Sequence, residues 1–359
     1  MPRRIVLIVS VMLLSAAAVL HGQDCNSLGV WLWHLEQTGF QEHGDLAPNL
    51  AAMGAKRVYV KVADGRINPD RWTELEDTDL VETYEQEGVE PWAWSYNYPE
   101  NDSLQGEALY RAAETGYKGF VVDVEMEFDG KPLALFNLFW AFSQARRRAI
   151  ADGIATDSFP LYITTWGNPQ DHSFPIAAID GLVTGYMPQT YVEVWGQSFM
   201  DRITHWINVG NQEYRDLGAT KPIHHICATQ EGLMTAELID EFIAASGPET
   251  SLWRVPGGGV PLSVWQEWWA TDWDADFCEQ TTDVSAPAEA HPAFYPNPTS
   301  DFLYFSGPLS GTVSVHDLMG RMVLRGSAEH GRLDVSALPD GIYLVRLSST
   351  GLTHRVIKN

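Results

Sequence analysis

The chain has 359 residues, of which 47 are Asp or Glu and 23 are Lys or Arg, so its formal net charge is −24. Such an acidic surface repels phosphate backbones, which excludes nucleic acid as an expected partner. The length is sufficient for more than one domain.

The amino terminus has the pattern of a secretory signal peptide. Arg3 and Arg4 precede an apolar run from Ile5 to Leu20, which is followed by small and polar residues. This order predicts a signal peptide over residues 1–22, since the run is too short for a convincing membrane span. No later run approaches the roughly 20 apolar residues of a spanning helix. We therefore expect an exported protein with no stable membrane span.

Apolar strand patterns then alternate with amphipathic helical patterns. The predicted strands are 29–35, 57–64, 90–98, 119–127, 160–166, 181–191, 222–230 and 262–268. One intervening helix, predicted from residue 79, has Asp79 and Glu82 in a capping-box relation. Eight units in about 250 residues predict an α/β fold, a (β/α)8 TIM barrel over residues 24–280. A doubly wound open sheet is the alternative, although no Gly-rich phosphate loop follows the first strand.

In a TIM barrel the functional residues follow the carboxyl ends of the strands. The side chains expected there are aromatic, amide and charged, which suits a sugar: flat rings pack on pyranose faces and polar groups bind hydroxyls. The predicted substrate-binding residues are Trp33, Lys61, Asp64, Tyr96, Glu127, Tyr162, Trp166, Tyr186, Gln189, Trp265 and Gln266.

The fourth predicted strand carries acids at every second position, Asp123, Glu125 and Glu127, which therefore share a face. Glycoside hydrolysis needs a proton donor and usually a second carboxylate. Two acids two residues apart have Cα atoms roughly 6.6 Å apart, and repulsion plus burial raises the pKa of one of them. We predict that Glu125 is the catalytic acid, with Asp123 as the charge that perturbs it. Alternatively, Asp123 accepts hydrogen bonds at strand ends while the other two acids are partly solvated.

The barrel segment resembles the family 25 glycoside hydrolases, the lysozyme-like muramidases, and their wider superfamily. The similar segments are KRVYVKVADGR, GVEPWAWSYNYP, GFVVDVE, LYITTW, VWQ and DADF. The resemblance implies that the catalytic Glu corresponds to Glu125 and a supporting Asp to Asp123. The first strand differs, because Trp31 stands where the family has an Asp. That difference implies another sugar substrate, another carboxylate such as Glu36 in the role, or a barrel that only binds glycan.

Three functions remain open at this point. The first is a secreted glycoside hydrolase that cleaves a polysaccharide, with peptidoglycan as a candidate. The second is a catalytically inactive carbohydrate-binding barrel on the cell surface. The third is a barrel hydrolase of another type, but the sequence has no HExxH or G-x-S-x-G motif, which disfavours zinc peptidases and serine esterases. We expect no cofactor and no metal.

Three cysteines are present, and an exported protein can form one bridge. Cys25 and Cys278 bracket the barrel segment, and a closed barrel brings these ends together, so we expect them to pair. Cys227 lies in an apolar strand-like run and is expected to be a buried core residue.

The segment 281–291 is rich in Pro and Ala without periodicity, which indicates a linker. After it, short alternating runs separated by Gly and Pro predict a small antiparallel β-sandwich over residues 292–359. These runs are DFLYF, TVSVHD, RMVLR, GIYLVRL and HRVIK.

This tail resembles the C-terminal sorting domain of proteins exported by the type IX secretion system of Gram-negative bacteria. The matching segments are YPNP, VHDLMGR and LDVSALPDGIY, together with the near-terminal Lys358. The resemblance implies passage through the periplasm and across the outer membrane, recognition by the type IX machinery, and release or attachment at the cell surface.

Overall fold

The computed structural model describes residues 26–65, 70–71, 73–275, 277, 294–295, 298–305, 312–317, 321–327, 332–347 and 353–359. The predicted signal peptide, the linker 281–291 and both members of the Cys25–Cys278 pair lie outside these ranges. That bridge stays a prediction, which mass mapping of the non-reduced protein would test. Cys227 is fully buried, as expected for a core residue.

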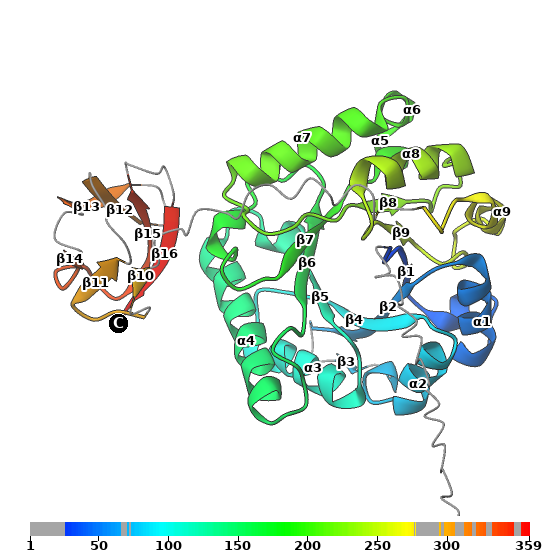
Figure 1. Cartoon of the computed structure of the whole chain (residues 1–359), viewed down its shortest axis with the longest axis horizontal. Helices are drawn as coiled ribbons and strands as arrows, with labels where there is room; N and C mark the ends of the chain where they lie inside the picture. Colours follow the sequence, from blue (N-terminus) through cyan, green and yellow to red (C-terminus); the bar gives the residue numbers. More distant parts are fainter. Residues whose placement is uncertain are drawn as a thin grey trace, which may run out of the picture.

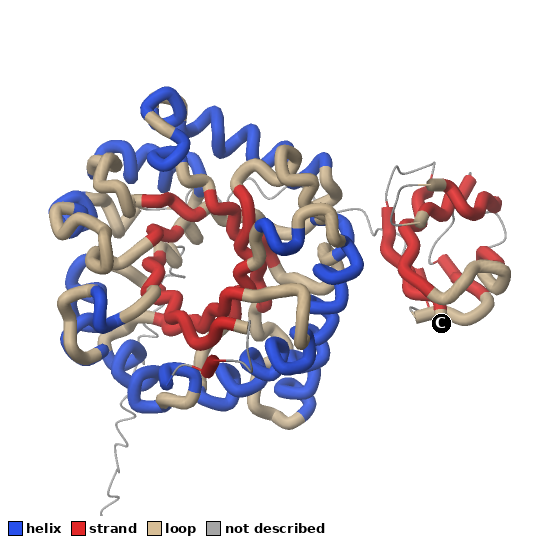
Figure 2. Tube along the Cα trace, turned by 180° about the vertical axis from the view of Figure 1, so that it is seen from behind, coloured by secondary structure: helices blue, strands red, loops and turns tan. Residues whose placement is uncertain are grey.

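Eight parallel strands close into a barrel in the described part of the chain, and helices surround them (Figures 1 and 2). The sheet closes because β1 pairs with both β2 and β9. A two-residue strand, β3 (Asp70–Arg71), adds antiparallel to β2. The barrel strands are β1 (Gly29–Leu32), β2 (Arg57–Asp64), β4 (Glu90–Tyr96), β5 (Phe120–Asp123), β6 (Leu161–Trp166), β7 (Gly185–Gln189), β8 (Ile226–Ala228) and β9 (Ser251–Trp253). The predicted TIM barrel is confirmed.

The surrounding helices use local signals in the sequence. The carboxylate of Asp77 accepts a 3.0 Å hydrogen bond from the Leu80 amide and caps α2, so Asp77 takes the capping position that we had assigned to Asp79. None of the helices in the described ranges is long and apolar enough to cross a membrane. They are α1 (His43–Met53), α2 (Thr78–Gln86), α3 (Asp102–Thr115), α4 (Pro132–Ala151), α5 (Val192–Trp195), α6 (Gln197–Met200), α7 (Ile203–Asp216), α8 (Ala236–Ser246) and α9 (Val264–Ala270).

Two predicted strands need correction. The strand that carries the acids ends at Asp123, so Glu125 lies beyond it and Glu127 lies in a 3-10 turn (Met126–Phe128). The eighth strand is β9, whereas the segment 262–268 contributes to helix α9. Its apolar pattern is helical, because the buried side chains Val264 and Trp268 are four residues apart.

The interior of the barrel is filled largely by aromatic rings. Trp31 stacks on Tyr59 with ring centroids 4.6 Å apart, and Trp94 packs edge-on against Trp31 at 5.5 Å. A Cβ at Gly119 would lie 2.6 Å from the Trp92 ring, so this position requires glycine. Burying each such ring contributes about 2 kcal/mol, which makes the lumen a packed core.

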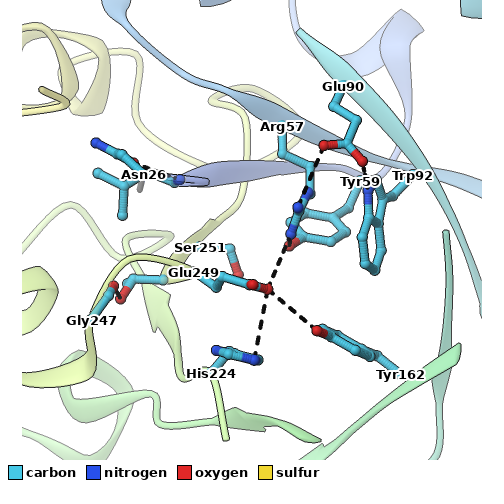
Figure 3. Close-up of polar contacts among 12 residues, drawn as sticks. Asn26, Arg57, Tyr59, Glu90, Trp92, Tyr162, His224, Gly247, Glu249 and Ser251 are labelled. Atoms are coloured by element: carbon cyan, nitrogen blue, oxygen red, sulfur yellow. Dashed lines mark hydrogen bonds and ion pairs between the residues drawn. The ribbon is translucent and has the colours of Figure 1, made fainter. Parts of the chain in front are cut away.

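We call the amino ends of the strands the lower mouth and their carboxyl ends the upper mouth. Figure 3 shows the lower mouth, where the carboxylate of Glu249 is the centre of several contacts. It lies 3.4 Å from Arg57 Nη1, 3.4 Å from the Tyr162 hydroxyl and 3.7 Å from His224 Nε2. Glu90 lies 3.5 Å from the other terminal nitrogen of Arg57.

The guanidinium of Arg57 is buried, with 6% of the residue exposed. Burial opposes its charge, but Tyr59, Glu90 and Glu249 more than compensate, so the pKa of Arg57 is raised. Burial lowers the pKa of His224, with the charge of Glu249 opposing and that of Arg57 assisting, so the imidazole is held neutral at pH 7. The lower mouth is therefore a compensated charge cluster.

The tail forms two antiparallel sheets with one shared core. One sheet consists of β10 (Phe294–Tyr295), β11 (Phe302–Phe305) and β14 (Arg332–Asp334); the other of β13 (Met322–Ser327), β12 (Thr312–His316), β15 (Gly341–Leu347) and β16 (Thr353–Lys358). Leu303 and Leu333 from the first sheet pack in one cluster with Val313, Val315 and Val345 from the second. The predicted small all-β domain is confirmed.

Candidate active site

A cavity of about 170 Å³ opens at the upper mouth. Strand ends β5, β6 and β7 provide its polar wall, and aromatic rings provide the rest. Trp31, which stands where the family resemblance expects an Asp, is buried and lines this cavity with its indole N–H bonded to the Ser251 hydroxyl at 2.9 Å. The lining residues are Trp31, Asp123, Glu125, Thr164, Gln189, Tyr191, Ile226 and Trp253.

Two of the three predicted acids meet at one amide. Gln189 Nε2 donates to Asp123 Oδ1 and to Glu125 Oε1, both at 3.1 Å. Asp123 is 6% exposed at the end of β5, whereas Glu125 is partly exposed at the edge of the cavity. The arrangement leaves Glu125 as the carboxyl that a ligand in the cavity can reach.

Both carboxyl groups have raised pKa values, for different reasons. Burial is the main cause for Asp123, with the charge of Glu125 adding and that of Lys61 opposing, and its pKa lies well above the usual range. Burial also raises the pKa of Glu125, against the hydrogen bond from Gln189, and the charges of Glu127 and Asp129 add to it. The charges that raise the pKa of Glu125 come from Glu127 and Asp129 rather than from Asp123.

The third acid has a separate partner. The Tyr96 hydroxyl donates to Glu127 Oε2 at 3.0 Å, and burial followed by the charges of Glu125 and Glu127 raises the pKa of this tyrosine. Glu127 therefore acts on the site through its charge and through Tyr96, at a greater distance from the cavity than Glu125.

The predicted cation and its neighbours lie beside the acids. Lys61 Nζ is 3.3 Å from Asp64 Oδ2 and 5.2 Å from the centre of the Trp94 ring. Trp33 lies between two cations, with Lys61 at 5.9 Å and Arg254 at 4.6 Å from its ring centre. Lys61, Asp64 and Trp33 thus gather at the upper mouth.

Trp166 belongs to a cluster that the sequence analysis did not include. Its indole N–H donates to Asp129 Oδ1 at 2.9 Å, and its ring stacks on His172 with centroids 3.8 Å apart. His172 Nδ1 lies 3.3 Å from the other oxygen of Asp129. Asp129 follows the acid run by two residues, so extending that run along the chain would have indicated it.

Five of the eight lining residues were also missing from the predicted set, namely Trp31, Thr164, Tyr191, Ile226 and Trp253. Tyr191 lies two residues after Gln189, a spacing that could have indicated it. Trp253 ends a strand of only three residues, which is too short to show an alternating pattern in the sequence. Thr164 is 1% exposed, and its hydroxyl makes no hydrogen bond to any described residue, so a ligand in the cavity would supply a partner.

Four predicted binding residues lie elsewhere. Tyr162 is at the lower mouth, bonded to Glu249. Tyr186 belongs to the apolar core between the strands and the helices, not to the barrel interior, and its hydroxyl donates to Asp180 at 2.9 Å. Trp265 packs against Phe40 from helix α9, and Gln266 is exposed on that helix. Trp265 and Gln266 lie away from the cavity because residues 264–270 are helical rather than extended.

Within the described residues no group of three or more His, Cys, Asp or Glu side chains is arranged to hold a metal ion. The chemistry visible at the upper mouth is that of carboxyl groups, amides and aromatic rings.

The tail, residues 293–359, matches the family described as the secretion system C-terminal sorting domain. This match indicates an exported protein that is secreted or attached at the cell surface. No curated protein matches the chain.

Among solved structures, the chain is similar to the endo-β-1,4-mannanase of Thermotoga petrophila, with a TM-score of 0.51, 9% identity, and coverage of 94% of this chain and 98% of that one. It is also similar to the spore cortex-lytic enzyme SleL of Bacillus cereus, with a TM-score of 0.50, 10% identity, and coverage of 70% and 74%. At such identities the likeness is one of fold, the TIM barrel.

Proposed function

We propose that the barrel is a glycoside hydrolase that cleaves a polysaccharide outside the cell, with Glu125 as its proton donor. The observation that carries this proposal is the position of Glu125, a partly exposed carboxyl with a raised pKa at the rim of an aromatic cavity. A glycosidic oxygen needs a donor that is still protonated near neutral pH. The names of the two neighbouring folds, a mannanase and a cortex-lytic enzyme, support the same class.

We propose further that the substrate is a 2-acetamido glycan, with peptidoglycan as the first candidate. Asp123 is buried, and burial raises its pKa and so disfavours the carboxylate form that a nucleophile needs. The cavity is below the roughly 300–1,000 Å³ of ordinary ligand pockets, and it suits a sugar substituent better than a whole saccharide. The resemblance to family 25 and the name of the cortex-lytic enzyme favour peptidoglycan.

The reaction then proceeds in two steps. The proton of Glu125 passes to the glycosidic oxygen as the C1–O bond breaks, while the acetamido oxygen of the substrate bonds to C1. Water then attacks C1, breaks that bond and gives a proton back to Glu125. Gln189 and Asp123 are positioning residues, since Gln189 holds both carboxyl groups in place. Because C1 is attacked twice, the product keeps the configuration of the substrate.

The test uses the full chain and a panel of polysaccharides that includes peptidoglycan. Glu125→Gln keeps shape but cannot deliver a proton, so release of reducing ends should fall by about 10²-fold or more while glycan binding persists. Glu36→Gln is the matched control, because Glu36 is exposed and was the alternative carboxylate. If the unaltered protein binds glycan but releases no reducing ends, the barrel is a binding module and the enzyme proposal is wrong.

For export, we propose the type IX route, with residues 1–22 as the signal peptide. The match of the tail to a sorting-domain family supports this. Deletion of residues 292–359 should leave the barrel in the periplasm. Normal levels of the truncated protein at the surface or in the medium would contradict the route.

A further inference from the structure

A second cavity, which we call the outer pocket, lies between the loop after β6 and helices α5, α6 and α7. Its volume is about 410 Å³. Trp195, Phe199 and Trp206 form one of its walls, and successive ring centroids in this series are 5.6 Å and 4.7 Å apart. Helices α5 to α7 follow one another along one edge of the barrel (Figure 1). The outer pocket is therefore an aromatic surface on one side of the barrel.

Polar groups face this aromatic wall. Asn168 Nδ2 donates to Asp171 Oδ2 at 3.0 Å, and Glu213 Oε2 accepts from the Gln170 amide at 3.3 Å. A carboxylate has about four lone-pair sites, so both acids can accept further hydrogen bonds. The indole nitrogen of Trp206 is buried and makes no hydrogen bond to any residue in the described ranges. Rings on one side and acceptors on the other are what a sugar requires.

The outer pocket lies next to the catalytic cavity. Gly167 lines the outer pocket, and a Cβ there would be 2.6 Å from the Gln189 carbonyl oxygen and 2.9 Å from the Trp195 ring. Gln189 lines the catalytic cavity with its side chain. Gly167 and Gln189 are thus close neighbours that line different spaces, so a polymer that extends from the catalytic cavity can reach the outer pocket.

We propose that the outer pocket is a second glycan-binding site, which holds a sugar of the same polymer away from the bond that is cleaved. The choice of ligand rests on the proposed function. The volume supports it, because 410 Å³ falls within the roughly 300–1,000 Å³ of ligand pockets, whereas the catalytic cavity is too small to hold a saccharide. The outer pocket then supplies affinity for long chains that the catalytic cavity cannot.

The experiment measures binding isotherms on insoluble peptidoglycan and on chitin, using the full chain with Glu125→Gln to prevent cleavage. Trp206→Ala should weaken binding by about tenfold, since it removes one ring of the aromatic wall. Asp171→Ala is a second variant, at an exposed side chain, and it should weaken binding by about threefold. Trp269→Ala is the control, because it removes a 50% exposed indole from helix α9 outside both cavities. Its affinity should be unchanged.

Unchanged affinity in both Trp206→Ala and Asp171→Ala, or no binding of either polymer by the parent chain, would overturn the second site. With Glu125 intact, Trp206→Ala should slow the release of reducing ends from insoluble glycan, while the rate of hydrolysis of a short soluble glycoside stays the same. An equal loss on both substrates would also count against it. Absence of hydrolysis by the unaltered protein would overturn the proposed reaction and leave the binding result standing.

Discussion

The two mouths of the barrel both contain buried charged groups, but they balance them differently. At the lower mouth, Glu249 and Glu90 both contact Arg57, so the carboxylates have a cation as partner. At the upper mouth, Asp123 and Glu125 share one neutral amide, and Lys61 is held by Asp64. The acids of the upper mouth therefore share an amide as their partner, and burial raises the pKa of both.

This difference indicates that the lower mouth contributes to stability and the upper mouth to chemistry. A compensated cluster at the amino ends of the strands stabilises the barrel, as is usual at that face. Burial of a carboxyl group destabilises its ionised form and raises its pKa, and this is useful where a proton is to be transferred. The same lumen of aromatic rings supports both arrangements. Substitutions at the two ends should consequently have opposite effects.

The largest expected effect on stability is at the lower mouth. Arg57→Met leaves Glu249 and Glu90 without their cation, and should lower the free energy of unfolding by about 2 kcal/mol, less than for a fully buried pair because the partners are partly exposed. Urea denaturation measures this. Arg111→Met, which breaks exposed pairs with Glu76 and Glu114, is the control and should change stability by less than about 0.5 kcal/mol. Equal losses would contradict the comparison.

At the upper mouth the removal of a buried charged group should raise the free energy of unfolding at pH 7, not lower it. The pKa of Asp123 is raised in the fold, so its contribution to stability is fully present below the unfolded value of 3.8 and is lost as the pH rises through the folded value. Asp123→Asn removes this loss, and the variant should be more stable than the parent at pH 7 but not at pH 3. Turnover should fall by about tenfold, since Asp123 shares the Gln189 amide with Glu125 and helps to position it. Melting curves at both pH values would check it; a less stable variant at pH 7 would contradict it.

The fold could be predicted from the sequence almost completely, because burial inside a barrel leaves strong apolar patterns. The exact agreement at β2, residues 57–64, reflects seven successive buried residues followed by the partly exposed Asp64. The eighth strand was missed because Ser251–Trp253 is too short to show a pattern, while the nearby helix α9 is rich in tryptophan.

The site was only partly predictable. Asp123, Glu125 and Gln189 could be found, since polar residues at the ends of apolar strands are conspicuous. A strand is so short that a residue near its first position and one near its last differ by only a few positions. Tyr162, the second residue of β6, was therefore expected at the wrong mouth. The pairing of Asp129 with His172 joins residues 43 positions apart, which no local pattern reveals.

A smaller effect is expected on the pH dependence of the rate, through the pKa of Glu125. The charge of Asp129 helps to raise the pKa of Glu125, so Asp129→Asn should lower that pKa. Because a proton donor is active below its pKa, the basic limb of the pH–rate profile should move to lower pH. Asp152→Asn, at a remote exposed site, should leave the profile unchanged. A shift toward higher pH would contradict this assignment.

The most direct test of the contrast between the mouths is a paired measurement on two matched variants, Glu125→Gln and Glu249→Gln. For each, kcat on the cleaved glycan and the melting temperature are measured together. We predict that Glu125→Gln loses about 10²-fold in kcat with its melting temperature unchanged or raised. Glu249→Gln should keep its kcat and melt at least about 3 °C lower, because Arg57 loses a partner. If Glu125→Gln keeps its turnover, or if Glu249→Gln loses turnover without loss of stability, the assignment of chemistry to the upper mouth is wrong.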